Sequence, residues 1–200
     1  MATIANVQPD LREDLVIDPF PSLKVLATAY LMLDREQVKL PDGPSMSLLE
    51  TVYYEWTPDI DEFLKLHKAP DNLTFAAFRK SLTSDSLDLV GLSFFNRITR
   101  MGGGYNKAEV GFAFFAGGSI FEKLILGRKM IDWVFANRDI HLLFGTTPEQ
   151  NIPALVYARR LGFTQSAKIP NFATWRGALT DAWISSLTRE DWRGRNGRSV

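Results

Sequence analysis

Apolar residues in the first 70 positions recur about every three to four residues and are interrupted by prolines, a pattern typical of short helices. The segments expected here are a short strand at 2–8, a helical turn at 10–17, a helix at 22–37, and a helix that starts after Ser45 or Ser47 and continues through 48–53. Pro58 ends or restarts that helix before Phe63, Leu64 and Leu66. The pattern therefore predicts a helical N-terminal region.

From Leu73 the pattern changes to runs of β-forming residues. The strands expected are 73–79 and 87–98, which form an antiparallel hairpin, then 108–115, 141–145, 164–173 and 181–187; the helices expected are 120–137 and 152–160. This order predicts an α/β (α+β) fold with a mixed, mostly antiparallel sheet flanked by helices.

Composition limits the class of protein. The 200 residues, 46% of them apolar, suit one domain, which we place at 1–192, followed by a basic, flexible tail at 193–200. The chain has no cysteine, which excludes disulfides and thiolate nucleophiles, and His67 and His141 are too few to suggest a metal site. We interpret His67 as a favourable charge at a helix end and His141 as a strand-edge residue.

No apolar run reaches the roughly 18 residues of a membrane span, and residues 1–10 do not resemble a signal peptide, so we expect a cytoplasmic protein. Residues 1–90 carry 8 basic and 15 acidic side chains, whereas residues 91–200 carry 15 basic and 8 acidic ones. A basic half suits a phosphorylated ligand and an acidic half suits a cationic amine, although solvated surfaces would give the same asymmetry.

One motif is specific. Asn151 is followed by Ala154 and, after a helical stretch, by Leu161-Gly162-Phe163, where Gly162 can end the helix in the left-handed conformation. This spacing resembles the second signature of the GNAT acetyltransferases. Residues 108–112 (AEVGF) and 181–192 are similar to strands of the subgroup that contains the ribosomal-protein N-terminal acetyltransferases. The resemblance covers 73–192 and leaves 1–70 as a helical substrate side.

The resemblance implies a GNAT acyl-CoA N-acyltransferase fold and direct transfer of an acetyl group from acetyl-CoA to a primary amine, such as a protein N-terminus. The strand from Glu109 to Phe115 would bind pantetheine, with the N–H of Phe114 polarising the thioester carbonyl. Asn151 would offer its amide to pantetheine, and Glu109 would act as general base. A surface charge is the alternative role for Glu109.

The phosphate loop departs from the family pattern of Gln or Arg, two residues, Gly, one residue, and Gly or Ala. Gly117 and Gly118 precede the helix that begins near Ser119, and these three residues could hold the pyrophosphate. However, Ser119 and Glu122 also spell a capping box, whose carboxylate would repel a pyrophosphate. Both interpretations remain open, so the acetyl-CoA site is either retained or lost.

The family's catalytic tyrosine would fall on Ala158, one position after Tyr157. Tyr157 is therefore either an acid for the departing thiolate or a packing residue, because one position turns a side chain by about 100° around a helix. The alternative to an enzyme is a non-catalytic GNAT-like component of a larger assembly, such as a phage particle, in which case the protein would be virion-associated. A homo-oligomer is compatible with either hypothesis, whereas nucleic acid is not an expected partner.

Overall fold

The structure, a computed structural model, describes residues 13–39, 45–81, 84 and 86–196. The strand expected at 2–8 lies outside these residues. Among the described residues, no helix is long and apolar enough to cross a membrane.

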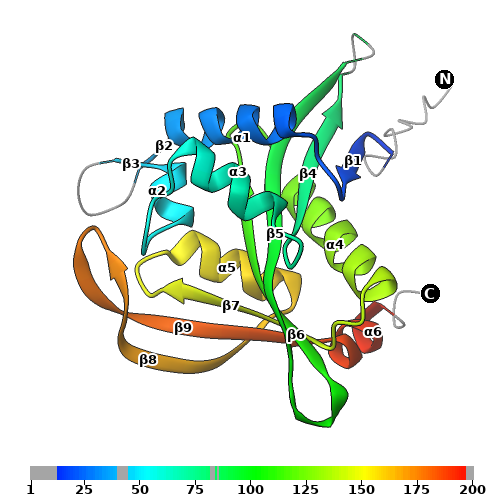
Figure 1. Ribbon diagram of the computed structural model, residues 1–200, viewed down its shortest axis with the longest axis vertical. Helices are drawn as coiled ribbons and strands as arrows, with labels where there is room; N and C mark the ends of the chain where they lie inside the picture. The colour runs from blue at the N-terminus through cyan, green and yellow to red at the C-terminus, as the bar shows by residue number, and fades with distance from the viewer. Residues whose placement is uncertain (1–12, 40–44, 82–83, 85, 197–200) are drawn as a thin grey trace, which may run out of the picture.

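The described chain forms a seven-stranded sheet and a small two-stranded one (Figure 1). In spatial order the large sheet consists of β1 (Leu15–Asp18), β4 (Leu73–Lys80), β5 (Leu87–Arg100), β6 (Asn106–Phe114), β7 (Leu142–Pro148), β9 (Ala178–Thr188) and β8 (Thr164–Trp175), and the small sheet pairs β2 (Gln37–Val38) with β3 (Met46–Ser47). Every pairing in the large sheet is antiparallel except that of β6 with β7. The predicted mixed, mostly antiparallel sheet is confirmed.

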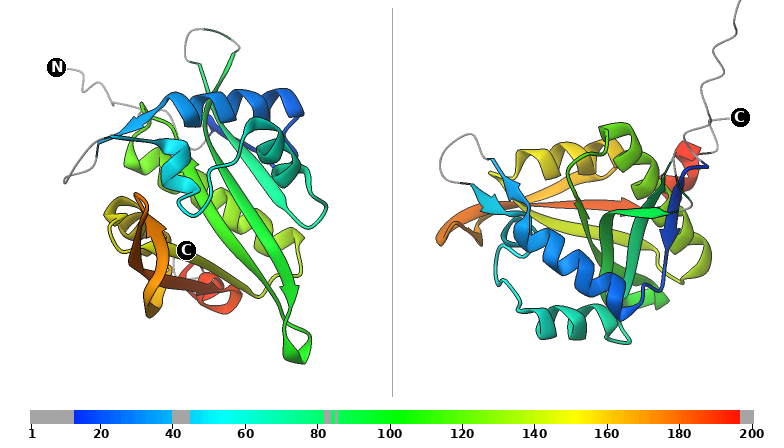
Figure 2. Two further views of the ribbon diagram at one scale, coloured as in Figure 1. Left: turned by 60° about the vertical axis from the view of Figure 1, so that its left-hand side comes forward. Right: turned by 90° about the horizontal axis from the view of Figure 1, so that it is seen from above.

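Helices cover both faces of this sheet. On one face lie α1 (Leu23–Arg35), α2 (Leu48–Val52) and α3 (Ile60–Lys68); on the other lie α4 (Ile120–Asn137) and α5 (Ile152–Leu161), and α6 (Arg189–Asn196) follows β9. Figure 2 (right) shows α1 and α3 on one side of the strands and α5 on the opposite side. The 3₁₀ turn η1 (Gly102–Gly104) joins β5 to β6.

Local capping explains where most helices begin. The side chains of Ser22, Ser47, Asp59, Ser119 and Asn151 each accept a backbone N–H in the first turn of α1 to α5, respectively. Gly162 ends α5 with φ 102°, the left-handed conformation that the sequence predicted. Because these interactions span only a few residues, the helices occur close to where the sequence placed them.

Strand alternation divides the core into two clusters. Phe75 and Phe95 face the α4 side, whereas Ala76 and Leu92 on the same two strands face α1 to α3. All four are buried, and each large side chain contributes about 1.5–3 kcal/mol by leaving water.

Three expectations differ from the structure. The helical turn predicted at 10–17 is wrong at 15–17, because Leu15–Asp18 form β1 and pair with β4, while 10–12 lie outside the described residues. The interpretation of His67 as a charge at a helix end is also wrong. Burial lowers the pKa of His67 to about 4, so the imidazole is neutral at pH 7. Residues 193–196 of the expected tail form the last turn of α6, and 197–200 lie outside the described residues.

Candidate functional site

The site is a gap between two parallel strands. β6 and β7 pair only from Lys107–Leu142 to Glu109–Phe144, and beyond this point the strands separate (Figure 1). Directly after β6, Phe115 N donates to Val90 O of β5 (3.0 Å), while Asn106 O at the start of β6 accepts from His141 N, which precedes β7 (2.8 Å).

Because hydrogen-bonding groups alternate along a strand, the even-numbered residues of β6 point their N–H groups toward β7. The N–H groups of Phe112 and Phe114 therefore face the gap, beyond the last paired position. This is the orientation that the predicted role of Phe114 requires. The N–H of Phe115 faces β5, and its side chain is buried with α1 to α3 on the other side of the sheet.

A cavity of about 330 Å³ occupies the gap. Its wall is mainly apolar and comes largely from β6, β7, α2, α4 and α5. Phe112 and Phe114 form one side with Tyr157, whose ring centroid lies 5.5 Å and 5.6 Å from theirs. The cavity therefore presents an apolar slot next to two backbone donors, a shape that suits the thioester end of a pantetheine chain.

Asn151 lines this cavity at the start of α5. Its Oδ1 accepts from Ala154 N at 3.3 Å and so caps the helix. The side-chain amide nitrogen is the group left to act as a donor to a ligand. Asn151 therefore caps α5 as well as lining the cavity, whereas the sequence predicted only a role in ligand binding.

Tyr157 also lines the cavity, but its hydroxyl donates to Lys123 O in α4 at 2.7 Å. Burial raises the pKa of this phenol well above its ordinary value. Ala158, onto which the resemblance placed the catalytic tyrosine, also lines the cavity. The geometry favours Tyr157 as a packing residue that ties α5 to α4.

Glu109 lies at the point where β6 and β7 separate. Its carboxylate pairs with Arg97 at 3.1 Å, and Arg97 is placed there by a bulge in β5, where it adopts φ 50°. Burial raises the pKa of Glu109, Arg97 opposes the shift, and the nearby Glu55 adds to it. A carboxylate with a raised pKa is better suited to accept a proton near neutral pH.

The loop before α4 lies outside this lining. Gly117, Gly118 and Ser119 do not line the main cavity, and neither do Phe121 and Glu122. Ser119 N donates to Glu122 Oε2 at 2.5 Å and Glu122 N donates to Ser119 Oγ at 3.2 Å, so the capping box predicted by the sequence is formed. Phe121 is 72% exposed and points away from the core, so it does not close the cavity.

Comparisons with known proteins identify the fold. No family model matches the sequence, and no curated protein matches it. Solved structures do: the spermidine N-acetyltransferase of Vibrio cholerae in complex with CoA and spermine superposes with a TM-score of 0.67 and 14% identity, covering 90% of this chain and 98% of that one.

The ribosomal-protein-S5-alanine acetyltransferase of Vibrio fischeri superposes with a TM-score of 0.62 and 20% identity, over 90% of this chain and 95% of its own. A point mutant of the Vibrio cholerae spermidine N-acetyltransferase gives a TM-score of 0.66 and 13% identity, over 92% of this chain and 99% of its own. This chain has the GNAT fold. The fold predicted from the Asn151 to Phe163 motif is therefore confirmed.

Within this GNAT fold, sequence reasoning missed three residues of the site. Tyr54 follows α2, lines the cavity and donates its hydroxyl to Thr146 O at 3.2 Å. Lys123 lines the cavity one turn into α4, a position that follows from the helix period once Ser119 is taken as the cap. No sequence pattern indicated a role for Arg97, because only the bulge in β5 brings it next to Glu109.

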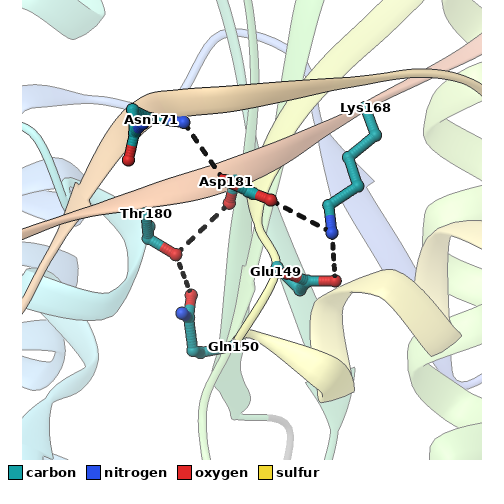
Figure 3. Close-up of polar contacts among 6 residues, drawn as sticks. All are labelled: Glu149, Gln150, Lys168, Asn171, Thr180 and Asp181. Atoms are coloured by element: carbon teal, nitrogen blue, oxygen red, sulfur yellow. Dashed lines mark hydrogen bonds and ion pairs between the residues drawn. The ribbon is translucent and has the colours of Figure 1, made fainter.

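A cluster of polar side chains lies near the end of β7, next to the cavity (Figure 3). Lys168 of β8 contacts Glu149 Oε1 at 2.8 Å and Asp181 Oδ2 at 3.1 Å, and the hydroxyl of Thr180 donates to Gln150 Oε1 at 2.6 Å. Glu149 and Gln150 directly precede Asn151, so the β8–β9 hairpin holds the start of α5 in position.

Proposed function

We propose that this chain is an N-acetyltransferase that transfers an acetyl group from acetyl-CoA to a primary amine by direct attack. The observation that carries the proposal is the gap between β6 and β7, where the N–H groups of Phe112 and Phe114 face an apolar cavity. It is supported by the neighbours in the same fold, which are a spermidine N-acetyltransferase with CoA bound and a ribosomal-protein-S5-alanine acetyltransferase.

The donor side of the site provides electrostatic stabilisation. The N–H of Phe114 would donate to the thioester oxygen as that oxygen gains negative charge, in a cavity with a mainly apolar lining. Removing one such donor typically slows an acyl transfer by about 10²–10³-fold. Asn151 would orient the pantetheine amides with its side-chain nitrogen, while its oxygen stays on Ala154 N.

The acceptor side depends on Glu109. An ammonium group must lose a proton before its nitrogen can attack, and Glu109 would accept that proton directly or through one water. The nitrogen then forms a bond to the carbonyl carbon and loses its second proton to water, the carbon–sulfur bond breaks, and the thiolate takes up a proton from solvent. Arg97, 3.1 Å from Glu109, opposes the rise in the pKa of this carboxylate that burial causes.

The experiment is a thiol-release assay with acetyl-CoA and a panel of amines that includes spermidine and an alanine-terminated peptide. We expect thiol release that depends on the amine, and a fall of about 10²-fold or more in kcat/KM for Glu109→Gln. Glu190→Gln, an exposed carboxylate in α6, is the matched control and should retain full activity. No CoA binding and no thiol release with any amine would refute the proposal.

One observation favours a second candidate, a non-catalytic GNAT-like binding or structural component. The capping box at Ser119 and Glu122 places a carboxylate where the fold would accept the pyrophosphate of CoA. This candidate predicts a stable complex or oligomer during size-exclusion chromatography and no thermal shift with acetyl-CoA. A monomer stabilised by micromolar acetyl-CoA would exclude it.

A further inference from the structure

The first turn of α4 is occupied by its own carboxylate. The Glu122 side chain accepts from Ser119 N at 2.5 Å, and Arg79 Nη1 lies 3.4 Å from its other oxygen. Helix starts bind phosphate through unpaired N–H groups and the positive end of the helix dipole. In α4 two of those groups, the N–H of Ser119 and the N–H of Glu122, are already paired, and a negative charge lies beside the rest.

That carboxylate is charged at neutral pH. Burial by itself would raise the pKa of Glu122, but the hydrogen bonds from Ser119 and the contact with Arg79 outweigh it, so the pKa lies below its ordinary value. The Arg79 guanidinium is in turn compensated by Glu122. A pyrophosphate at this position would therefore meet a carboxylate and a neutralised arginine.

The space beside the helix is open but unfavourably charged. A side chain at Gly117 would meet no atom within 4 Å, whereas one at Gly118 would lie 3.5 Å from Glu122 Oε2 and 3.6 Å from Lys123 Cε. Lys123 is the one charged residue among the described residues that line the main cavity. A single phosphate at the end of the pantetheine arm thus has a cation available, and a second phosphate next to Glu122 does not.

We infer that the donor is recognised by its pantetheine arm and the phosphate that ends that arm, with Lys123 as the cation, and that the second phosphate and nucleoside of CoA add little affinity. This inference rests on the proposed function and narrows its donor to the class of acyl-phosphopantetheine thioesters, to which acetyl-CoA belongs as one member. Glu122 is the residue that sets this preference.

The test is isothermal titration of the full chain with CoA and, separately, with 4′-phosphopantetheine. For the wild type we expect dissociation constants within about tenfold of each other. Glu122→Gln retains a residue that can complete a capping box but removes the charge and leaves Arg79 uncompensated. It should tighten CoA binding about fivefold or more, the effect of one unit charge at roughly 4 Å in water, and change phosphopantetheine binding less than about twofold.

Glu62→Gln is the matched control, because Asp59 and Glu62 form the same capping box at the start of α3, outside the cavity lining. It should leave both affinities unchanged. CoA binding more than about tenfold tighter than phosphopantetheine in the wild type, or an unchanged ratio in Glu122→Gln, overturns the inference while the proposed function stands. Binding of neither compound overturns the proposed function, and the inference with it.

Discussion

The contact between α4 and α5 depends on the absence of a side chain at Gly127. A methyl group there would overlap the hydroxyl oxygen of Tyr157 and would lie 3.1 Å from both methyl carbons of Leu161. Gly127 is buried within α4, and the tyrosine hydroxyl crosses it to reach Lys123 O. Gly127→Ala therefore tests whether the two helices that flank the cavity are held by this contact.

The expected magnitude combines three effects. Alanine in place of glycine within a helix contributes about 1 kcal/mol of stability. Overpacking costs about 1–3 kcal/mol, because Tyr157 lies against Phe112 and Phe114 and has little room to move. Loss of the hydrogen bond to Lys123 O costs about 1 kcal/mol more. We expect a net loss of about 1–3 kcal/mol in the free energy of unfolding.

Urea denaturation followed by tryptophan fluorescence measures this loss, and Tyr157→Phe provides the second arm of a double-mutant cycle. Tyr157→Phe alone should cost about 1 kcal/mol. The Tyr157→Phe protein lacks the hydroxyl oxygen that a methyl group at position 127 would overlap. In that protein, Gly127→Ala should therefore lower the free energy of unfolding by about 1–2 kcal/mol less than it does in the wild type. A Gly127→Ala protein as stable as the wild type, or an equal cost in both backgrounds, would refute the reasoning.

Three further predictions concern other parts of the chain. Burial holds the pKa of His67 near 4, below its unfolded value, so its contribution of about 3 kcal/mol is present above pH 6.5 and is lost as the pH falls toward 4. His67→Gln should flatten the dependence of unfolding free energy on pH over that interval, and a slope equal to that of the wild type would contradict this. Gly111→Ala should destabilise the protein by about 1–3 kcal/mol in urea titrations, because a methyl group would overlap the ring of Phe94, whereas Gly102→Ala, with no atom within 4 Å of the added carbon, should change stability by less than about 0.5 kcal/mol. Lys168→Met should speed hydrogen exchange at residues 149–152 and weaken CoA binding in titrations, because both carboxylates lose their cation; unchanged exchange there would show that the cluster does not hold this segment.

The sequence determined the features that depend on neighbouring residues. The caps at Ser47 and Ser119, the left-handed end at Gly162, and the positions of most strands follow from interactions that span a few positions, so they could be predicted without the fold. The motif from Asn151 to Phe163 identified the fold for the same reason, since its spacing is local.

The tertiary structure alone decided the features that join distant segments. β1 is a strand because it pairs with β4 some 60 residues later, and His67 is neutral because Phe63, Tyr53 and Phe94 surround it.

The residues of the site are also brought together only by the tertiary structure. Phe114, Asn151 and Tyr157 were chosen separately from the sequence, but they share one cavity only because β6 and β7 separate after Glu109. The Arg97–Glu109 pair depends on a bulge in a neighbouring strand. Contacts between segments far apart in the chain depend on packing and sheet register, which short-range sequence patterns do not encode.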